Sequence, residues 1–187
     1  MANKDSKTFI SEVAFQCFTQ NGYKATTIAQ LVQASGMSKG AFYHHFKSKQ
    51  EVYEHVVETF FLAYYKELDW SEVAELPLKQ VLEVIPQRFS EFIREVKRFT
   101  QGEVSKYYVL FFEAFANIPT FRTTAQAFYS GFKALLCEKL LAETTATAQE
   151  AEIEATRTIA LYEGLFFWAA VFPDQDIEQY LSQFNAQ

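Results

Sequence analysis

The sequence predicts an all-α protein of about nine helices, and three observations support this fold class. Only six glycines and four prolines occur among the 187 residues, about half the usual share of these two turn-forming residues. Apolar residues recur at spacings of three and four along most of the chain, as on the buried face of a helix. Capping boxes, which mark helix starts, begin at Thr27, Ser48 and Thr147. A β-sandwich or barrel would need many more turns.

The N-terminal part of the chain predicts three short helices and the start of a longer one. Residues 9–18 carry apolar side chains at helical spacing. A second helix is expected to begin at the Thr27 capping box and to end near Gly36. A third is expected over residues 38–46, and a fourth over residues 48–68.

The rest of the chain predicts further helices separated by short breaks. These are expected over residues 78–99, 104–118, 120–143, 147–172 and 174–185. Pro86 should kink or restart the first of them, because proline lacks the amide hydrogen that a helix interior uses.

The charge of the chain is divided unevenly along its length. The net charge is −6 overall. Residues 1–50 contain six lysines and two acidic residues, giving +4, whereas the remaining residues contain 11 basic and 21 acidic side chains, giving −10. A basic segment before an acidic body favours a polyanion-binding module joined to a second part. Chance clustering of lysines on a solvated surface is the alternative.

The second and third predicted helices are separated by a short turn, which is the pattern of a helix-turn-helix. In that motif the second helix of the pair enters the major groove of DNA. Here it would be the helix over residues 38–46, with Lys39 at its start. Phe42 and Phe46, one turn apart, would anchor its inner face to the core, and Gly40 would allow a close approach.

The same segment resembles the N-terminal domain of the TetR/AcrR family of bacterial transcriptional regulators. The resemblance is carried by a pattern more specific than a bare helix-turn-helix, namely Gly36-x-Ser38-x-Gly40-x-x-Tyr43-x-x-Phe46 followed by Ser48-Lys49. It implies a three-helix DNA-binding domain over residues 1–47 and a helical effector-binding and dimerisation domain over residues 48–187.

The resemblance also implies which residues contact double-stranded operator DNA. The expected set is Thr27, Ser38, Lys39, Gly40, Tyr43, His44 and Lys49.

These residues have different expected roles. Thr27 would direct its hydroxyl or amide at a phosphate from a helix N-terminus, while Ser38 and Gly40 would meet base edges with Lys39. Lys39 is the best candidate for base readout, because a lysine can donate to guanine O6 and N7. Tyr43 and Lys49 would contact phosphates and His44 the groove or the backbone. The alternative for Tyr43 and His44 is a pair of surface aromatic side chains.

The body of the protein is rich in aromatic side chains, with 25 of the 32 aromatic residues after residue 50. Such stripes are often plain core, but ligand pockets are also mostly apolar with a few polar groups. The resemblance implies an inducer cavity in this body. Its expected lining is Phe89, Phe92, Tyr108, Phe112, Tyr129, Glu163 and Phe167.

Glu163 is the only charged residue within the apolar run over residues 159–172. A lone buried carboxylate is costly unless it is paired or protonated. Three interpretations remain open: it binds a cationic ligand together with aromatic faces, it pairs with Arg157 or Arg122, or it lies at the edge of a dimer interface.

A homodimer is implied by the resemblance, formed through the last two long helices, over residues 147–172 and 174–185. It also fits the geometry of an operator, since two recognition helices must reach half-sites one or more turns of DNA apart.

The sequence contains no pattern that indicates an enzyme. The motifs HExxH, GxGxxG and the phosphate-binding P-loop are absent. Residues 36–40 fit the formula of a nucleophile elbow, but a helix precedes them and no histidine follows His55. Glu51 and His55 could share a metal ion, but an ion pair explains two such groups better. No cofactor is expected.

The first residues are polar and charged, with no apolar stretch typical of a signal peptide. The run over residues 159–172 is too short to span a bilayer. Cys17 and Cys137 are expected to be unpaired, buried thiols, as in a cytoplasmic protein.

Together these features predict a ligand-responsive DNA-binding transcriptional regulator. It would be a repressor that a small apolar or aromatic effector, of unknown identity, releases from its operator. The alternative is a helical small-molecule-binding or structural protein whose N-terminal segment does not read DNA specifically.

Overall fold

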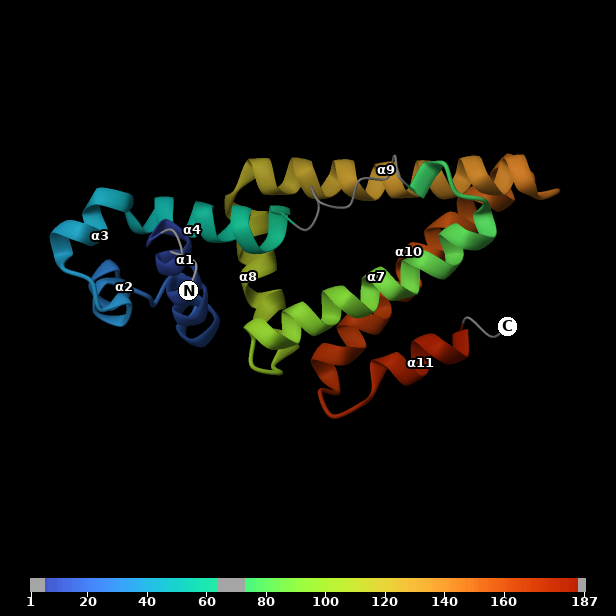
Figure 1. Cartoon of the computed structure of the whole chain (residues 1–187). Helices are drawn as coiled ribbons and strands as arrows, with labels where there is room; N and C mark the ends of the chain where they lie inside the picture. Colours follow the sequence, from blue (N-terminus) through green and yellow to red (C-terminus); the bar gives the residue numbers. More distant parts are fainter. Residues whose placement is uncertain (1–5, 64–72, 185–187) are drawn as a thin grey trace. The chain divides into compact units, whose positions relative to one another are not determined.

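The computed structural model describes residues 6–63 and 73–184, which form nine α-helices and one π-helical segment without any strand (Figure 1). The all-α prediction is therefore confirmed. The chain divides into two compact units, one of residues 1–67 and 106–125 and the other of residues 68–105 and 126–187. Within the described ranges, no helix is long and apolar enough to cross a membrane.

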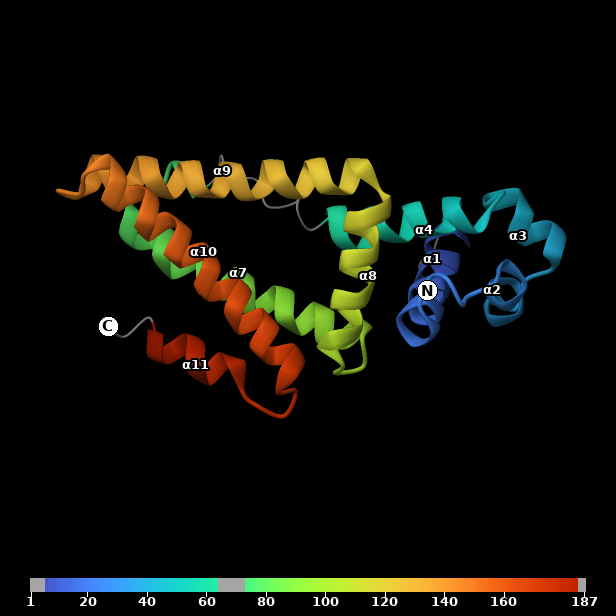
Figure 2. The same ribbon diagram turned by 180° about the vertical axis from the view of Figure 1, so that it is seen from behind.

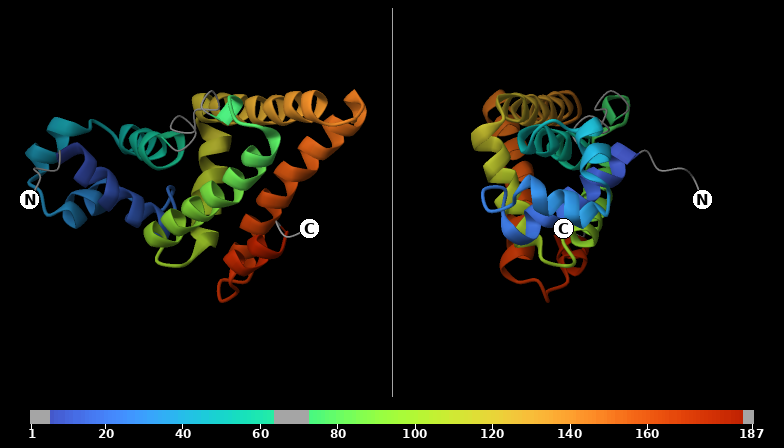
Figure 3. Two further views of the ribbon diagram at one scale, coloured as in Figure 1. Left: turned by 45° about the vertical axis from the view of Figure 1, so that its right-hand side comes forward. Right: turned by 90° about the vertical axis from the view of Figure 1, so that its left-hand side faces the viewer.

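The first unit contains the N-terminal helices and parts of two later ones. Its elements are α1 (Ser6–Asn21), α2 (Ile28–Ser35), α3 (Lys39–His45), α4 (Lys49–Val57), the π-helical segment η1 (Glu58–Leu62), most of α8 (Val104–Asn117) and the first turns of α9 (Pro119–Glu143). The short helices α2 and α3 follow each other across a tight turn (Figure 3). The fourth predicted helix changes to π-helical hydrogen bonding at Glu58, and its end beyond residue 63 lies outside the described residues.

Two of the three predicted capping boxes are complete. The Thr27 hydroxyl accepts a hydrogen bond from the Gln30 amide at 3.3 Å, and the Gln30 side chain accepts one from the Thr27 amide at 2.7 Å. Thr147 and Glu150 form the same pair of bonds at the start of α10 (Ala148–Val171). These bonds join groups only three residues apart, so the local sequence is enough to specify them.

The third predicted box, at Ser48, is only half formed. The Ser48 hydroxyl accepts from the Glu51 amide at 3.1 Å. The Glu51 carboxylate, however, accepts from the Lys47 amide at 2.7 Å instead of the Ser48 amide. The Glu51 side chain therefore still binds an amide that precedes the helix, but this amide is one residue earlier than in a complete capping box. The helix α4 begins at the predicted place.

The core of the first unit is aromatic. Phe18, Phe42, Phe46 and Tyr53 are almost completely buried. The Tyr53 hydroxyl donates to the backbone carbonyl of Leu110 on α8 at 3.1 Å, so α8 packs in the same compact unit as the N-terminal helices. The predicted functional division between residues 47 and 48 stays a prediction, because the compact units follow packing and not function.

The second unit is built from α7 (Leu78–Phe99), the longer part of α9, α10 and α11 (Ile177–Phe184). Its core combines apolar residues from α7, α9 and α10, with α10 running beside α7 in Figure 2. The central buried side chains are Val81, Ile85, Phe132, Leu136 and Ala155. The last helix begins at Ile177, three residues later than predicted, and Asp176 accepts from its Gln179 amide at 3.4 Å.

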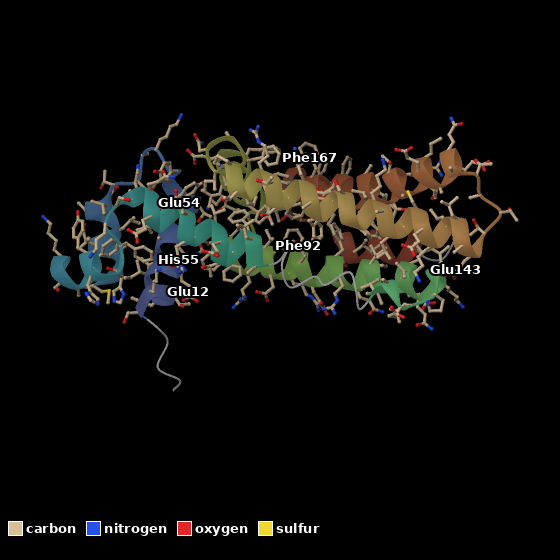
Figure 4. All side chains as sticks on the ribbon, turned by 90° about the horizontal axis from the view of Figure 1, so that it is seen from above. Glu12, Glu54, His55, Phe92, Glu143 and Phe167 are labelled. Carbon is tan, nitrogen blue, oxygen red and sulfur yellow. The ribbon has the colours of Figure 1, made fainter. Side chains whose placement is uncertain are left out.

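The start of α7 is stabilised from a distant part of the chain. Pro77 precedes the helix and offers no side-chain cap. Instead, both carboxylate oxygens of Glu143, at the end of α9, accept from the Leu78 amide at 3.0 and 2.9 Å (Figure 4). The helix continues through Pro86 without a restart, because the apolar face that includes Val81 is buried on both sides of the proline.

Cys17 and Cys137 are free thiols, as predicted, although both are half-buried instead of buried. Burial raises the pKa of the Cys17 thiol.

Candidate nucleic-acid interface

The turn between α2 and α3 is specified by one glycine. Gly36 has φ 65° and ψ 8°, in the left-handed region that glycine tolerates best, and its amide donates to the Gln33 carbonyl at 3.1 Å. Two residues later, the Ser38 hydroxyl accepts from the Ala41 amide at 3.2 Å and begins α3. The glycine therefore ends α2, and the serine starts the predicted recognition helix.

The two faces of α3 differ sharply in burial. Phe42 and Phe46 are completely buried, as predicted for the inner face. Lys39, Gly40 and His44 are exposed on the outer side, and Ser38 is exposed at the N-cap. Gly40 is helical, and a Cβ atom built there would meet nothing within 4 Å. The start of α3 is thus open to an approaching ligand.

Tyr43 and His44 lie near the end of α3. Tyr43 is half-buried, and its carbonyl accepts from the Lys47 ammonium at 2.6 Å. His44 is exposed and meets the ring of His45 edge-on at 5.3 Å. This role of Lys47 was not evident from the sequence, although cations near a helix C-terminus commonly bind the last carbonyls.

Thr27 is exposed at the start of α2, the first helix of the helix-turn-helix. Its hydroxyl also donates to the Gln30 side chain at 2.9 Å. The threonine is therefore held by its own capping box, with the helix N-terminus beside it.

The chain segment that contains α2 and α3 carries only basic charges. Between Glu12 and Glu51 the chain contains no Asp or Glu, but it contains four lysines. Lys24, Lys39 and Lys47 are exposed. Exposed lysines and helix N-termini attract phosphates.

Lys49 is directed differently from the other predicted DNA contacts. It is half-buried, and its ammonium donates to the carbonyls of Tyr23 and Thr26, each at 2.8 Å, and to that of Lys24 at 3.4 Å. The same ammonium lies 4.4 Å from the centre of the Tyr23 ring. Its hydrogen-bonding groups are therefore engaged within the protein.

Tyr23, which the sequence did not single out, connects several elements of the first unit. Its hydroxyl donates to Gln50 at 2.7 Å, and its amide donates to Glu113 of α8 at 3.3 Å. Its ring packs against that of Tyr53 with centroids 4.3 Å apart. Burial, followed by the charges of Glu113 and Glu54, raises the pKa of the Tyr23 phenol.

The side chain of His55 on α4 contacts α1. Its Nδ1 lies 2.9 Å from the Ser11 hydroxyl and 3.2 Å from that of Thr59 (Figure 4). Among the residues that the structure describes, no three His, Cys, Asp or Glu side chains gather as a metal site.

The residues predicted to line an effector cavity do not all share one environment. Phe89 and Phe92 of α7 are buried and half-buried, and they contact Tyr162 and Phe166 of α10, with ring centroids 5.0 and 4.9 Å apart. These two α10 partners were not predicted from the sequence, although their four-residue spacing places them on one face of the helix. Phe167, the neighbour of Phe166 on α10, is 59% exposed (Figure 4).

Tyr108 and Phe112 belong to α8 in the first unit. Their rings stack at 5.8 Å. Tyr108 is half-buried, whereas Phe112 is 61% exposed. These two residues therefore belong to a different compact unit from the other predicted lining residues.

Glu163 has a hydrogen-bond partner that none of its three interpretations included. Its side chain is exposed, and its Oε1 accepts from the Tyr129 hydroxyl at 2.6 Å. Neither predicted arginine forms its ion pair, because Arg157 pairs with Glu154 at 3.0 Å and Arg122 donates to the Phe115 carbonyl. Partial desolvation by the surrounding protein atoms raises the pKa of the Glu163 carboxyl, and the hydrogen bond from Tyr129 partly opposes that shift.

Comparison with known proteins points to one family. Residues 10–56 match the sequence profile described as "Bacterial regulatory proteins, tetR family". The HTH-type transcriptional repressor AcnR of Corynebacterium efficiens is 39% identical over 49 residues, which are 26% of each chain. The uncharacterized HTH-type transcriptional regulator YhgD of Bacillus subtilis is 33% identical over 76 residues, 41% of this chain and 40% of that protein.

These matches span well under two thirds of the relatives' own lengths, 26% of AcnR and 40% of YhgD. Over the whole fold, the chain resembles the TetR family transcriptional regulator PfmR of Thermus thermophilus, with a TM-score of 0.64 and 21% identity. That alignment covers 95% of this chain and 94% of the other. The fold of this chain is therefore similar to that of PfmR over many more residues than can be aligned with the two sequence relatives.

Proposed function

We propose that this chain, whose residues 10–56 belong to the tetR family of bacterial regulatory proteins, is a ligand-responsive transcriptional regulator that binds operator DNA. The observation that carries the proposal is the outer face of α3. That face presents Ser38, Lys39 and Gly40 to solvent while Phe42 and Phe46 anchor the inner face in the core. A helix held in this way can enter the major groove without losing its packing.

The proposed DNA contacts divide into two kinds. Lys39 and the groups around Gly40 would read base edges, because they lie at the exposed start of the recognition helix. Thr27, Tyr43 and His44 would contact the sugar-phosphate backbone and so fix the register of the protein on the duplex. The absence of carboxylates between Glu12 and Glu51 supports this assignment.

A mobility-shift titration on the DNA upstream of the protein's own gene tests the proposal. Specific binding should exceed binding to a scrambled duplex and should weaken steeply as salt rises. Lys39→Gln should reduce the preference for the specific duplex. Lys79→Gln, at an exposed position of α7, makes the same charge change in the second unit and should bind like the wild type. Equal affinity for both duplexes would favour the structural or small-molecule-binding alternative.

We propose that the DNA-binding form is a homodimer assembled through α10 and α11. Exposed apolar side chains on α10, among them Ile153, Phe167 and Val171, support this. Ala160 and Gly164 are exposed between them on the same helix and would let a second helix approach closely. A second copy of the chain is the occupant that a symmetric operator requires.

Analytical ultracentrifugation tests the dimer. Phe167→Glu should shift the equilibrium to monomer, because it places a charge in the proposed interface. Leu82→Glu, at a similarly exposed apolar position on α7, should leave the dimer intact. A Phe167→Glu protein that remains dimeric would place the interface elsewhere.

The effector is proposed to be a small apolar or aromatic molecule bound by the second unit. Support comes from the aromatic pairs between α7 and α10 and from the Tyr129–Glu163 hydrogen bond. Binding there would lower DNA affinity through a coupling of about 1–3 kcal/mol. If Glu163 faces a cationic effector, Glu163→Gln should abolish the response to that class of molecule, and an unchanged response would rule this role out.

A further inference from the structure

Lys49 stands at the first position of α4 and reaches back to the turn that joins α1 to α2. The three hydrogens of its ammonium match three backbone acceptors, the carbonyls of Tyr23, Lys24 and Thr26. The Tyr23 ring lies beneath the same charge, 4.4 Å away. A lysine held in this way has no hydrogen left to donate to a phosphate without breaking one of these bonds.

The turn itself is shaped so that its carbonyls converge. Both the amide and the hydroxyl of Thr26 donate to the Gly22 carbonyl, at 3.2 and 2.8 Å, and Thr26 is fully buried. These bonds curl residues 22–26 into a loop that ends at Thr27, the N-cap of α2. Carbonyl dipoles that point at one place repel each other unless a cation lies between them.

Neighbouring contacts hold the other side of the turn. The Tyr23 amide donates to Glu113, and the Tyr23 hydroxyl donates to Gln50, the residue after Lys49. The Tyr23 ring also rests on Tyr53 of α4. The turn is therefore fixed to α4 through Lys49, Gln50 and Tyr53, and to α8 through Glu113.

We propose that Lys49 is a positioning residue, which orients the N-terminus of α2 toward DNA by binding the carbonyls of the preceding turn, and that it is not itself a phosphate contact. The inference rests on the proposed DNA-binding function. It assigns the two lysines at helix starts different tasks, since Lys39 is exposed at the start of α3 and Lys49 is enclosed at the start of α4.

Salt dependence separates the two roles. Each phosphate contact that is lost reduces the slope of log affinity against log salt by about 0.9. Lys49→Gln should therefore weaken binding to all duplexes about tenfold while it leaves that slope unchanged. Lys39→Gln serves as the comparison for an exposed lysine in the groove. A slope that falls by about one in Lys49→Gln would overturn the proposal.

Hydrogen exchange on the free protein gives a readout that does not need DNA. In Lys49→Gln the amides of Tyr23 and Thr26 should exchange about tenfold faster or more, because hydrogen bonds to a charged group are among the stronger ones. The Phe42 amide, bonded to the Ser38 carbonyl at 3.0 Å, should be unaffected. Unchanged exchange at Tyr23 and Thr26 would also overturn the proposal.

Lys49→Arg covers the case in which the glutamine variant does not fold. An arginine could replace a phosphate contact with affinity retained, but its planar guanidinium cannot meet three converging carbonyls as an ammonium does. The positioning role predicts weaker binding at unchanged slope together with faster exchange in the turn, and full affinity with normal exchange would refute it. If the wild type shows no salt-dependent DNA binding, the proposed function fails, whereas the exchange experiment still decides the role of Lys49 in the turn.

Discussion

The hydroxyl of Tyr53 on α4 donates a hydrogen bond to the backbone carbonyl of Leu110 on α8, at 3.1 Å and out of contact with solvent. The two residues are 57 positions apart in the chain. This bond, together with the packing around it, makes α8 part of the same compact unit as the predicted DNA-binding helices.

Tyr53→Phe should destabilise the protein by about 1 kcal/mol, since it removes one buried hydrogen bond without removing the ring. Denaturant unfolding measures the change. Tyr43→Phe is the matched control, because Tyr43 is half-buried at the surface of α3. The free energy of unfolding of this variant should stay within about 0.5 kcal/mol of the wild-type value. Equal losses in both variants would mean that the buried bond contributes nothing specific.

Stability should fall at alkaline pH. Burial raises the pKa of Tyr162 to about 12, and burial followed by the charge of Glu113 also raises the pKa of Tyr53. The unfolded chain releases both phenolic protons near the ordinary value of 10.0, whereas the folded chain keeps them. The free energy of unfolding therefore declines as the pH rises above that value, and the part due to Tyr162 is complete above about pH 12.

Urea unfolding over this pH range, followed together with tyrosinate absorbance, checks the decline. Tyr162→Phe should show a smaller loss of stability than the wild type. An identical decline in the two proteins would assign the effect to other groups.

Two glycines of the helix-turn-helix should respond differently to the same substitution. Gly36→Ala should cost about 1 kcal/mol of stability, because alanine is strained at φ 65° even though there is room for its methyl group. Gly40→Ala should stabilise α3 by about 0.5–1 kcal/mol, since the position is helical and open. The same Gly40 variant should bind operator DNA more weakly, because the added methyl group lies on the proposed groove-facing side.

Thermal unfolding and a DNA titration on each variant separate the two effects. Gly40→Ala with wild-type DNA affinity would show that no close approach occurs at that position.

Two carboxylates should show opposite effects of pH on stability. The pKa of Glu163 is raised, so its ionised form is disfavoured in the folded state and stability falls as the pH rises through its titration. The pKa of Glu152 is lowered by its hydrogen bond and its attraction to Lys133, so its contribution is present at neutral pH and is lost as the pH falls.

At neutral pH, Glu163→Gln should therefore be neutral or stabilising, since the amide oxygen can still accept from Tyr129. Glu152→Gln should be destabilising, and the difference between it and the wild type should shrink in acid. Unfolding experiments at neutral and acidic pH measure both, and a clear destabilisation by Glu163→Gln at neutral pH would contradict the direction of its pKa shift.

The parts of the fold that were predictable are those specified by neighbouring residues. The Thr27 and Thr147 capping boxes and the Gly36 turn depend on groups within a few positions of one another. The burial of Phe42 and Phe46 followed from their helical spacing.

The features that sequence analysis missed depend on distant packing or on flexible side chains. The bond from Tyr53 to α8 becomes evident only when the two helices are in place. The direction of the Lys49 side chain could not be predicted. The side chain is long and flexible, so the same backbone position allows its ammonium to reach either solvent or the carbonyls of the α1–α2 turn. The three interpretations of Glu163 did not include Tyr129, its hydrogen-bond partner on α9, which is 34 positions away in the chain.

The cap that Glu143 provides for Leu78 has a consequence for the order of folding events. Its two partners are 65 positions apart, so the chain must close a long loop before the bond can form. Until then the first amide of α7 lacks a side-chain hydrogen bond from its N-cap residue, because that residue is Pro77. The interior of α7 can therefore form early from local contacts, while its first turn is completed late, when the end of α9 arrives.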